Sequence, residues 1–157
     1  MFVFEDGYII TRDKLTLVDI EKTENIQIPS TVTNLGTFSC MRNNQLREID
    51  IPEGIEEIGI CAFAFCENLT RVHLPDSLTQ LGMNAFEACE ISELNIPPKV
   101  SVISEMCFGY NELDLSQLQI PSTIKRIDDY GFYCNDSAAH VNIPEGVEYI
   151  GRCALSG

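Results

Sequence analysis

The amino-acid sequence predicts a repeat solenoid built from about six coils of 22–24 residues. The first observation is a dipeptide, isoleucine or leucine followed by proline, that recurs at separations of 23, 23, 22, 24 and 23 residues. The second is that apolar, small and aromatic residues fall into columns at fixed distances after each dipeptide. One such unit cannot bury its apolar side alone, so neighbouring units must stack into a continuous core. The dipeptides are Ile28-Pro29, Ile51-Pro52, Leu74-Pro75, Ile96-Pro97, Ile120-Pro121 and Ile143-Pro144.

A short strand is predicted immediately before each proline. Two apolar residues flank one polar residue there, as in Ile49-Asp50-Ile51 and Val72-His73-Leu74. Period-two alternation is typical of a strand with one buried face, and the proline marks its end because it cannot donate a ladder hydrogen bond. Stacked coils place these strands side by side in a parallel sheet. The other predicted strands lie at 26–28, 94–96, 118–120 and 141–143.

The columns that follow each dipeptide define the predicted core. The residues four and seven positions after the isoleucine or leucine of each dipeptide are aliphatic, and the residue twelve positions after it is mostly phenylalanine. We expect this phenylalanine column to form a buried ladder, so that replacing Phe86 by alanine costs about 3–5 kcal/mol. The position eight residues on is rich in glycine, which suits a positive φ or a tight bend. A further column, expected to turn inward and satisfy backbone groups, holds Asn43, Cys66, Cys89, Asn111 and Asn135.

Residues 1–22 do not follow the repeat and are predicted to cap it. Two apolar segments, 2–4 and 8–10, flank Asp6-Gly7, which predicts a hairpin around an Asp-Gly turn. Residues 15–17 are a candidate third strand. Residues 23–157 then form the solenoid, which makes the chain a single domain. Because the sequence stops part way through a coil, we expect either further repeats or pairing of this end with another molecule.

The chain is strongly acidic, with 10 Lys and Arg against 24 Asp and Glu and a net charge of −14. This balance repels phosphate backbones and anionic membrane surfaces, and it suits a basic patch on a protein partner. No run approaches the ~18 consecutive apolar residues that a membrane helix needs. No signal peptide is visible at the start. We therefore expect neither a nucleic-acid partner nor direct membrane insertion.

The columns resemble those of the BspA-like, or Treponema pallidum type, leucine-rich repeats. Segments 58–63 and 69–78 carry the match closely, and in-phase copies cover about residues 23–157. The resemblance implies a right-handed solenoid of the α/β class with a parallel sheet on its concave side. It also implies an extracellular or cell-surface protein of bacteria and, in several members, adhesion. It supplies no catalytic residue, cofactor or specific ligand. The departures are Ser104 and Asp128 for glycine, Cys40 and Leu155 for phenylalanine, and one residue inserted around Asn111–Leu118.

The seven cysteines are interpreted as buried thiols that pack within the columns. Their odd number and the absence of a Cys-x-x-Cys pair argue against a disulfide framework and against structural zinc. One alternative remains open, because Cys66 and Cys89 occupy the same column in neighbouring coils. Stacked at the strand spacing, they would lie near enough for a bridge.

The two histidines do not indicate catalysis. His73 and His140 lie three coils apart, roughly 14 Å at the strand spacing. The pattern places no serine or cysteine beside either of them, so nucleophilic catalysis has no support. We therefore expect a protein that is not an enzyme and that holds neither a metal nor a cofactor.

The exposed side of the predicted sheet is the strongest candidate for function. Its positions can vary without disturbing the core, so we expect a protein partner to bind there. The alternative is that its amides merely form hydrogen-bonded ladders; replacing Asn95 by alanine is expected to leave stability almost unchanged. A second hypothesis is a structural spacer, or a scaffold that self-associates through its C-terminal coil. The candidate binding residues are Glu48, Asp50, Arg71, His73, Glu93, Asn95, Gln117, Gln119, His140 and Asn142.

Overall fold

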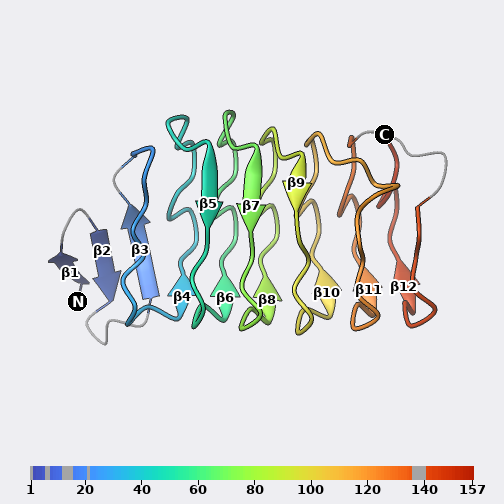
Figure 1. The fold of residues 1–157 in the computed structure, drawn as a ribbon, viewed down its shortest axis with the longest axis horizontal. Helices are drawn as coiled ribbons and strands as arrows, with labels where there is room; N and C mark the ends of the chain where they lie inside the picture. Colours follow the sequence, from blue (N-terminus) through green and yellow to red (C-terminus); the bar gives the residue numbers. More distant parts are fainter. Residues whose placement is uncertain (1, 6–7, 12–15, 21, 136–140) are drawn as a thin grey trace.

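The computed structural model is a β-solenoid whose coils stack side by side along the long axis (Figure 1). It describes residues 2–5, 8–11, 16–20, 22–135 and 141–157. The predicted parallel stacking of coils is confirmed. The α/β class is wrong, because the described residues form strands and turns without any helix. It follows that no helix in this part of the chain is long and apolar enough to cross a membrane.

Three of the six predicted strands form a sheet. Strands β5 (Glu48–Asp50), β7 (Arg71–His73) and β9 (Glu93–Leu94) pair in parallel, in the upper half of Figure 1. The apolar residue at the centre of β5 and of β7 is buried, as period-two alternation predicts. The predicted strands at 26–28, 118–120 and 141–143 are not formed.

A second set of parallel strands, not predicted from the sequence, runs along the lower edge of Figure 1. Its inner residues are the aliphatic column seven residues after the dipeptide. Strands of two residues show no alternation, so the pattern that revealed the first sheet is absent here. Strands β4 (Asn34–Leu35), β6 (Glu57–Ile58) and β8 (Gln80–Leu81) belong to one sheet, which the N-terminal strands extend, and β10 (Val102–Ile103), β11 (Arg126–Ile127) and β12 (Tyr149–Ile150) form another.

The N-terminal strands pair antiparallel with one another, unlike the strands of the coils. Strand β1 (Phe2–Glu5) pairs antiparallel with β2 (Tyr8–Thr11), as the predicted hairpin requires. The Asp6-Gly7 turn itself lies outside the described residues. Strand β3 (Thr16–Ile20) then pairs antiparallel with β2 and parallel with β4, which joins the hairpin to the solenoid. The capping role of this segment stays a prediction.

Close contact between neighbouring coils explains the glycine column. Gly54 is the one glycine of the described chain with a positive φ, and it lies outside that column. A Cβ added to Gly82 would lie 2.5 Å from the carbonyl carbon of Gly59, and one added to Gly59 would lie 2.7 Å from the Thr37 nitrogen. The column therefore requires glycine because backbones touch. Where Ser104 replaces it, the Ser104 hydroxyl donates to the Leu81 carbonyl (2.5 Å), and the sheet is interrupted between β8 and β10.

Positive φ angles occur instead at larger residues. In the described chain, 11 non-glycine residues adopt them, in two columns ten and fourteen residues after the dipeptide. In one coil these are Cys61 (φ 52°) and Phe65 (φ 61°). The alternating backbone turns the N–H groups of residues 61, 63 and 65 toward the next coil, where they donate to carbonyls at 3.0, 2.8 and 2.8 Å. These inter-coil bonds take the place of the helix implied by the α/β class.

The phenylalanine ladder is confirmed. The rings stack at centroid distances of 5.0, 5.6 and 5.5 Å in successive coils, nearly parallel at first and 13° apart at the last step. All of these side chains are fully buried. The ladder lies inside the turns just described and fills the core opposite the β5–β7–β9 sheet. Its members are Phe63, Phe86, Phe108 and Phe132.

The inward-turning column of asparagine and cysteine is confirmed as well. The Asn111 amide donates to the Phe86 carbonyl at 2.8 Å, and the Cys89 thiol donates to the Phe63 carbonyl at 3.3 Å. The Asn111 side-chain oxygen accepts from the Ile91 N–H at 3.0 Å. The Cys89 thiol thus replaces the N–H donor of the asparagine amide and satisfies the carbonyl of the preceding coil. It does not replace the amide oxygen, which accepts a hydrogen bond in the Asn111 coil.

Candidate protein-binding face

The β5–β7–β9 sheet presents polar side chains in two rows. The register aligns Glu48 with Arg71 and Glu93, and it aligns Asp50 with His73. All five side chains are exposed, while the residues between them in β5 and β7 belong to the core. We call these five residues the β5–β7–β9 face. The sequence placed them correctly because the two-residue period fixes which side of a strand each residue occupies.

Electrostatic contacts on this face are weak and open to solvent. Glu48 and Arg71 form an ion pair in which both side chains are at least half exposed. Such a pair contributes about 0–1 kcal/mol, so a partner can replace it at little cost. A shallow groove of about 340 Å³ runs across the face. It is lined by Asp50, Arg71, Val72, His73, Glu93, Leu94 and Asn95.

Asn95 does not have the free, exposed side chain that the sequence suggested. It is half-buried, and its amide nitrogen donates to the Leu74 carbonyl at 2.8 Å. Its side-chain oxygen accepts from the Leu74 N–H at 2.7 Å. Both backbone groups of Leu74 are thus satisfied by one side chain at the point where the β7–β9 ladder ends. Asn95 therefore has a structural contact that the sequence did not indicate, and we now expect its replacement by alanine to destabilise the fold.

The remaining predicted residues do not continue the rows on strands. Gln117 belongs to a turn in which its N–H donates to the Asp114 carbonyl at 3.1 Å. Gln119 is exposed, and its amide donates to the Gln117 carbonyl at 3.2 Å. Asn142 is exposed and, together with Gln119, lines a separate groove of about 400 Å³. His140 lies outside the described residues. The structure therefore divides the predicted face into the β5–β7–β9 face and the groove that Gln119 and Asn142 share.

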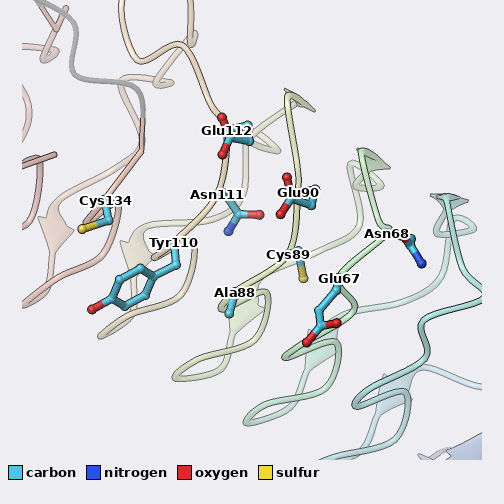
Figure 2. A pocket seen from close by; sticks show the side chains of 9 residues that line it. All are labelled: Glu67, Asn68, Ala88, Cys89, Glu90, Tyr110, Asn111, Glu112 and Cys134. Atoms are coloured by element: carbon cyan, nitrogen blue, oxygen red, sulfur yellow. The ribbon is translucent and has the colours of Figure 1, made fainter.

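A third groove, of about 650 Å³, was not found by sequence reasoning (Figure 2). Three carboxylates from successive coils line it, together with the exposed ring of Tyr110. The signal was present in the column sixteen residues after the dipeptide, directly after the asparagine and cysteine column. Glu67 accepts a hydrogen bond from Asn44 at 3.1 Å. These carboxylates are Glu67, Glu90 and Glu112.

The seven cysteines are free thiols that differ in burial. Cys40, Cys66, Cys89 and Cys107 are buried, as predicted, whereas Cys61 and Cys134 are half-buried and Cys153 is exposed, so the prediction is wrong for these three. Burial raises the pKa of Cys40 and Cys107, which keeps these thiols protonated and unreactive. A hydrogen bond between the stacked thiols lowers the pKa of Cys66 and raises that of Cys89. No disulfide links the stacked pair here.

The sequence matches one known family. The profile of the BspA type leucine rich repeat region matches in 6 copies, over residues 16–114 and 37–157. Together these matches span nearly the whole chain, which includes every strand of the β5–β7–β9 face. No curated protein sequence matches the chain.

Solved structures show the same fold at low sequence identity. A leucine rich repeat protein of T. pallidum shares 21% identity at a TM-score of 0.65, covering 92% of this chain and 82% of its own. A leucine-rich repeat protein of Eubacterium ventriosum shares 19% at a TM-score of 0.69, covering 99% and 49%. A leucine rich cell surface protein of Faecalibacterium prausnitzii shares 19% at 0.68, covering 99% and 52%. The chain thus spans about half the length of the last two.

Proposed function

Because the chain belongs to the BspA-type leucine-rich repeat family, we propose that it is a non-enzymatic protein-interaction module of a bacterial surface or secreted protein. The β5–β7–β9 face is its contact surface. The observation that carries the proposal is the alternation of buried and exposed residues in β5 and β7. The central residue of β5 and of β7 is buried, and both of its neighbours are exposed and polar. Such positions are free to vary for recognition without loss of the fold.

Chemistry around His73 supports binding rather than catalysis. The groove that contains this histidine is lined by carboxylates, one guanidinium, one amide and two aliphatic residues. Among these lining residues there is no serine, threonine, cysteine or lysine to act as a nucleophile beside the imidazole. The mixed charges of the face, with Arg71 between Glu48 and Glu93, suit a partner that offers both signs of charge. Charged groups arranged in this way give specificity and a faster association rate.

Surface location and adhesion are part of the proposal. The similar protein from F. prausnitzii is described as a cell surface protein, and the chain covers 52% of it. A protein exported to the surface meets host proteins and neighbouring cells, for which a rigid sheet of polar side chains is a suitable contact. Antibody labelling of intact cells tests the location, and labelling only after lysis would contradict it.

Adhesion is tested with beads that carry the purified protein and are incubated with host epithelial cells. The double variant Arg71→Ala/His73→Ala should reduce retained beads about tenfold, since interface arginines often carry much of the binding energy. Lys99→Ala removes one positive charge from an exposed position outside the face and serves as the control. Equal retention of both variants and the unaltered protein would exclude the face as the contact surface.

A self-associating scaffold is the second candidate. Ile150 in β12 is 47% exposed, whereas Ile127 at the same position in β11 is fully buried. A second molecule stacked on β12 would cover this side chain. Light scattering across a concentration series separates the candidates. A constant monomer supports the interaction module, whereas growth in size that Ile150→Lys abolishes supports the scaffold.

A further inference from the structure

Two large apolar side chains, Ile60 and Met83, are exposed on the turn side of two consecutive coils, nine residues after each dipeptide. They are 45% and 43% exposed. The Cys61 N–H donates to the Met83 carbonyl at 3.0 Å, which joins the two coils at this point, and both side chains line one groove. Single exposed apolar residues are ordinary, but neighbours that line one groove indicate an interaction surface.

Coil packing fixes the spacing of Ile60 and Met83. Gly59 and Gly82 stand one position before them. Any Cβ at either glycine would come within 2.7 Å of backbone atoms of the preceding coil. The coils are therefore in backbone contact at this point, and the placement of the two apolar residues does not depend on the conformation of a loop.

The groove has a volume of about 440 Å³ and is mostly acidic. Ile60 and Met83 form its apolar end. Glu105 follows Met83 in the same column of the next coil, and Asp128 and Asp129 lie one coil further. The lining includes these three carboxylates but a single cation, Arg126. The remaining lining residues are Ser104 and Tyr149.

The carboxylates differ in whether they are already paired. Asp128 forms an ion pair with Arg126, and Asp129 forms one with Arg152 at 3.2 Å. Glu105 is exposed, and no cation of the described chain forms an ion pair with it. The groove thus presents an apolar wall that is continuous with an unpaired negative charge.

We propose that this groove binds an extended segment of a partner protein in which apolar side chains are followed by a lysine or arginine. The apolar side chains would cover Ile60 and Met83, and the basic side chain would meet Glu105. Charge complementarity selects this occupant, because an acidic or phosphorylated segment would be repelled by the lining carboxylates and by the net charge of −14. The groove follows the second set of strands and is separate from the β5–β7–β9 face.

The test uses the full chain and three fluorescently labelled peptides. In the first peptide leucines precede lysines, in the second they precede glutamates, and the third is a scrambled form of the first. Fluorescence anisotropy should show binding of the leucine–lysine peptide, with much weaker binding of the other two. The double variant Ile60→Ser/Met83→Ser should raise its dissociation constant at least about tenfold, and Glu105→Gln should raise it by a smaller factor.

Matched controls separate the groove from general attraction to an acidic protein. Tyr110→Ser removes an equally exposed apolar ring elsewhere, and Glu145→Gln removes an exposed carboxylate outside the groove. Both should leave the affinity unchanged. Equal binding of the lysine and glutamate peptides, equal effects of control and groove variants, or no binding would overturn the proposal. So would self-association that Ile60→Ser/Met83→Ser abolishes, because the occupant would then be a second copy. The adhesion variants Arg71→Ala/His73→Ala leave this groove intact, so the two proposals fail independently.

Discussion

The phenylalanine ladder and the β5–β7–β9 sheet respond differently to the same inserted residue. Across Asn111–Leu118 the ladder continues, with Phe108 and Phe132 stacked at 5.5 Å and fully buried. The sheet stops at β9, and the next coil forms a turn around Asp114 instead of a strand. The difference shows that inward-facing columns hold the coils in register, whereas the outer strands pair only where the spacing permits.

The largest effect is expected in the ladder. Phe86→Ala should lower the free energy of unfolding by about 3–5 kcal/mol, because it removes a buried ring between two stacked neighbours. Phe108→Ala should cost a similar amount although it adjoins the irregular coil. Chemical denaturation measures both, with the exposed Phe38→Ala as control. A much smaller loss for Phe108→Ala would mean that the insertion loosens the ladder too.

The next effect is expected where coils touch. Gly82→Ala would place a methyl group 2.5 Å from the backbone of Gly59, so the coils must move apart. We expect a loss of about 1–3 kcal/mol, as for an overpacked core. Ser104→Gly at the interrupted step between β8 and β10 removes one hydrogen bond and should cost about 0.5–1.5 kcal/mol. If Gly82→Ala proved neutral in thermal unfolding, close contact would not be the reason for the glycine column.

An effect of similar size is expected at the end of the sheet. Asn95→Ala leaves the N–H and carbonyl of Leu74 without their side-chain partner. The expected cost is about 1–3 kcal/mol, as for unsatisfied buried groups. Gln119→Ala, beyond the end of the sheet, should change stability by less than about 0.5 kcal/mol. Urea denaturation of the two variants compares them directly, and equal losses would remove the distinction between a structural and a free amide.

The smallest effect is expected on the regular part of the face. Arg71→Ala should change the free energy of unfolding by less than about 1 kcal/mol, because its ion pair with Glu48 is exposed. Thermal unfolding at low and high salt should show little difference between this variant and the unaltered protein. A large, salt-dependent loss would mean that the exposed rows contribute to the fold and are not reserved for recognition.

Much of the core was predictable from single residues in repeating positions. The Phe86 column, the inward Asn111 column and strands β5 and β7 follow from periodicity, because each places one residue type at one place in every coil. Strands such as β6 were not predictable, since two residues cannot show a period. The positive φ angles at Cys61 and Phe65 were missed because neither residue is a glycine, the usual marker of a positive φ. The glycines stand in a different column, where they allow the backbones of neighbouring coils to touch.

The candidate site was predictable only in part. Alternation fixed the outward direction of Glu48, Arg71 and His73. It could not reveal that Asn95 turns back to Leu74, because that contact arises from the local end of a ladder and not from the repeat. The groove beside Ile60 was missed because its lining comes from several successive coils, and no single stretch of the sequence contains it.

The turn side of the solenoid also has an electrical polarity. The Ile60 carbonyl and the Cys61 N–H belong to one peptide unit, and they bond to opposite neighbouring coils. The same bond recurs at 3.0, 3.0, 3.0, 3.1 and 2.9 Å from Phe38 to Arg152, so the peptide dipoles align head to tail along the axis. Bonds along the second set of strands run the other way, as from the Gly59 N–H to the Leu35 carbonyl, so the polarity belongs to the turn side and not to the whole solenoid. A coil joined in the reversed direction would set donor against donor, so assembly along this axis has a single permitted sense.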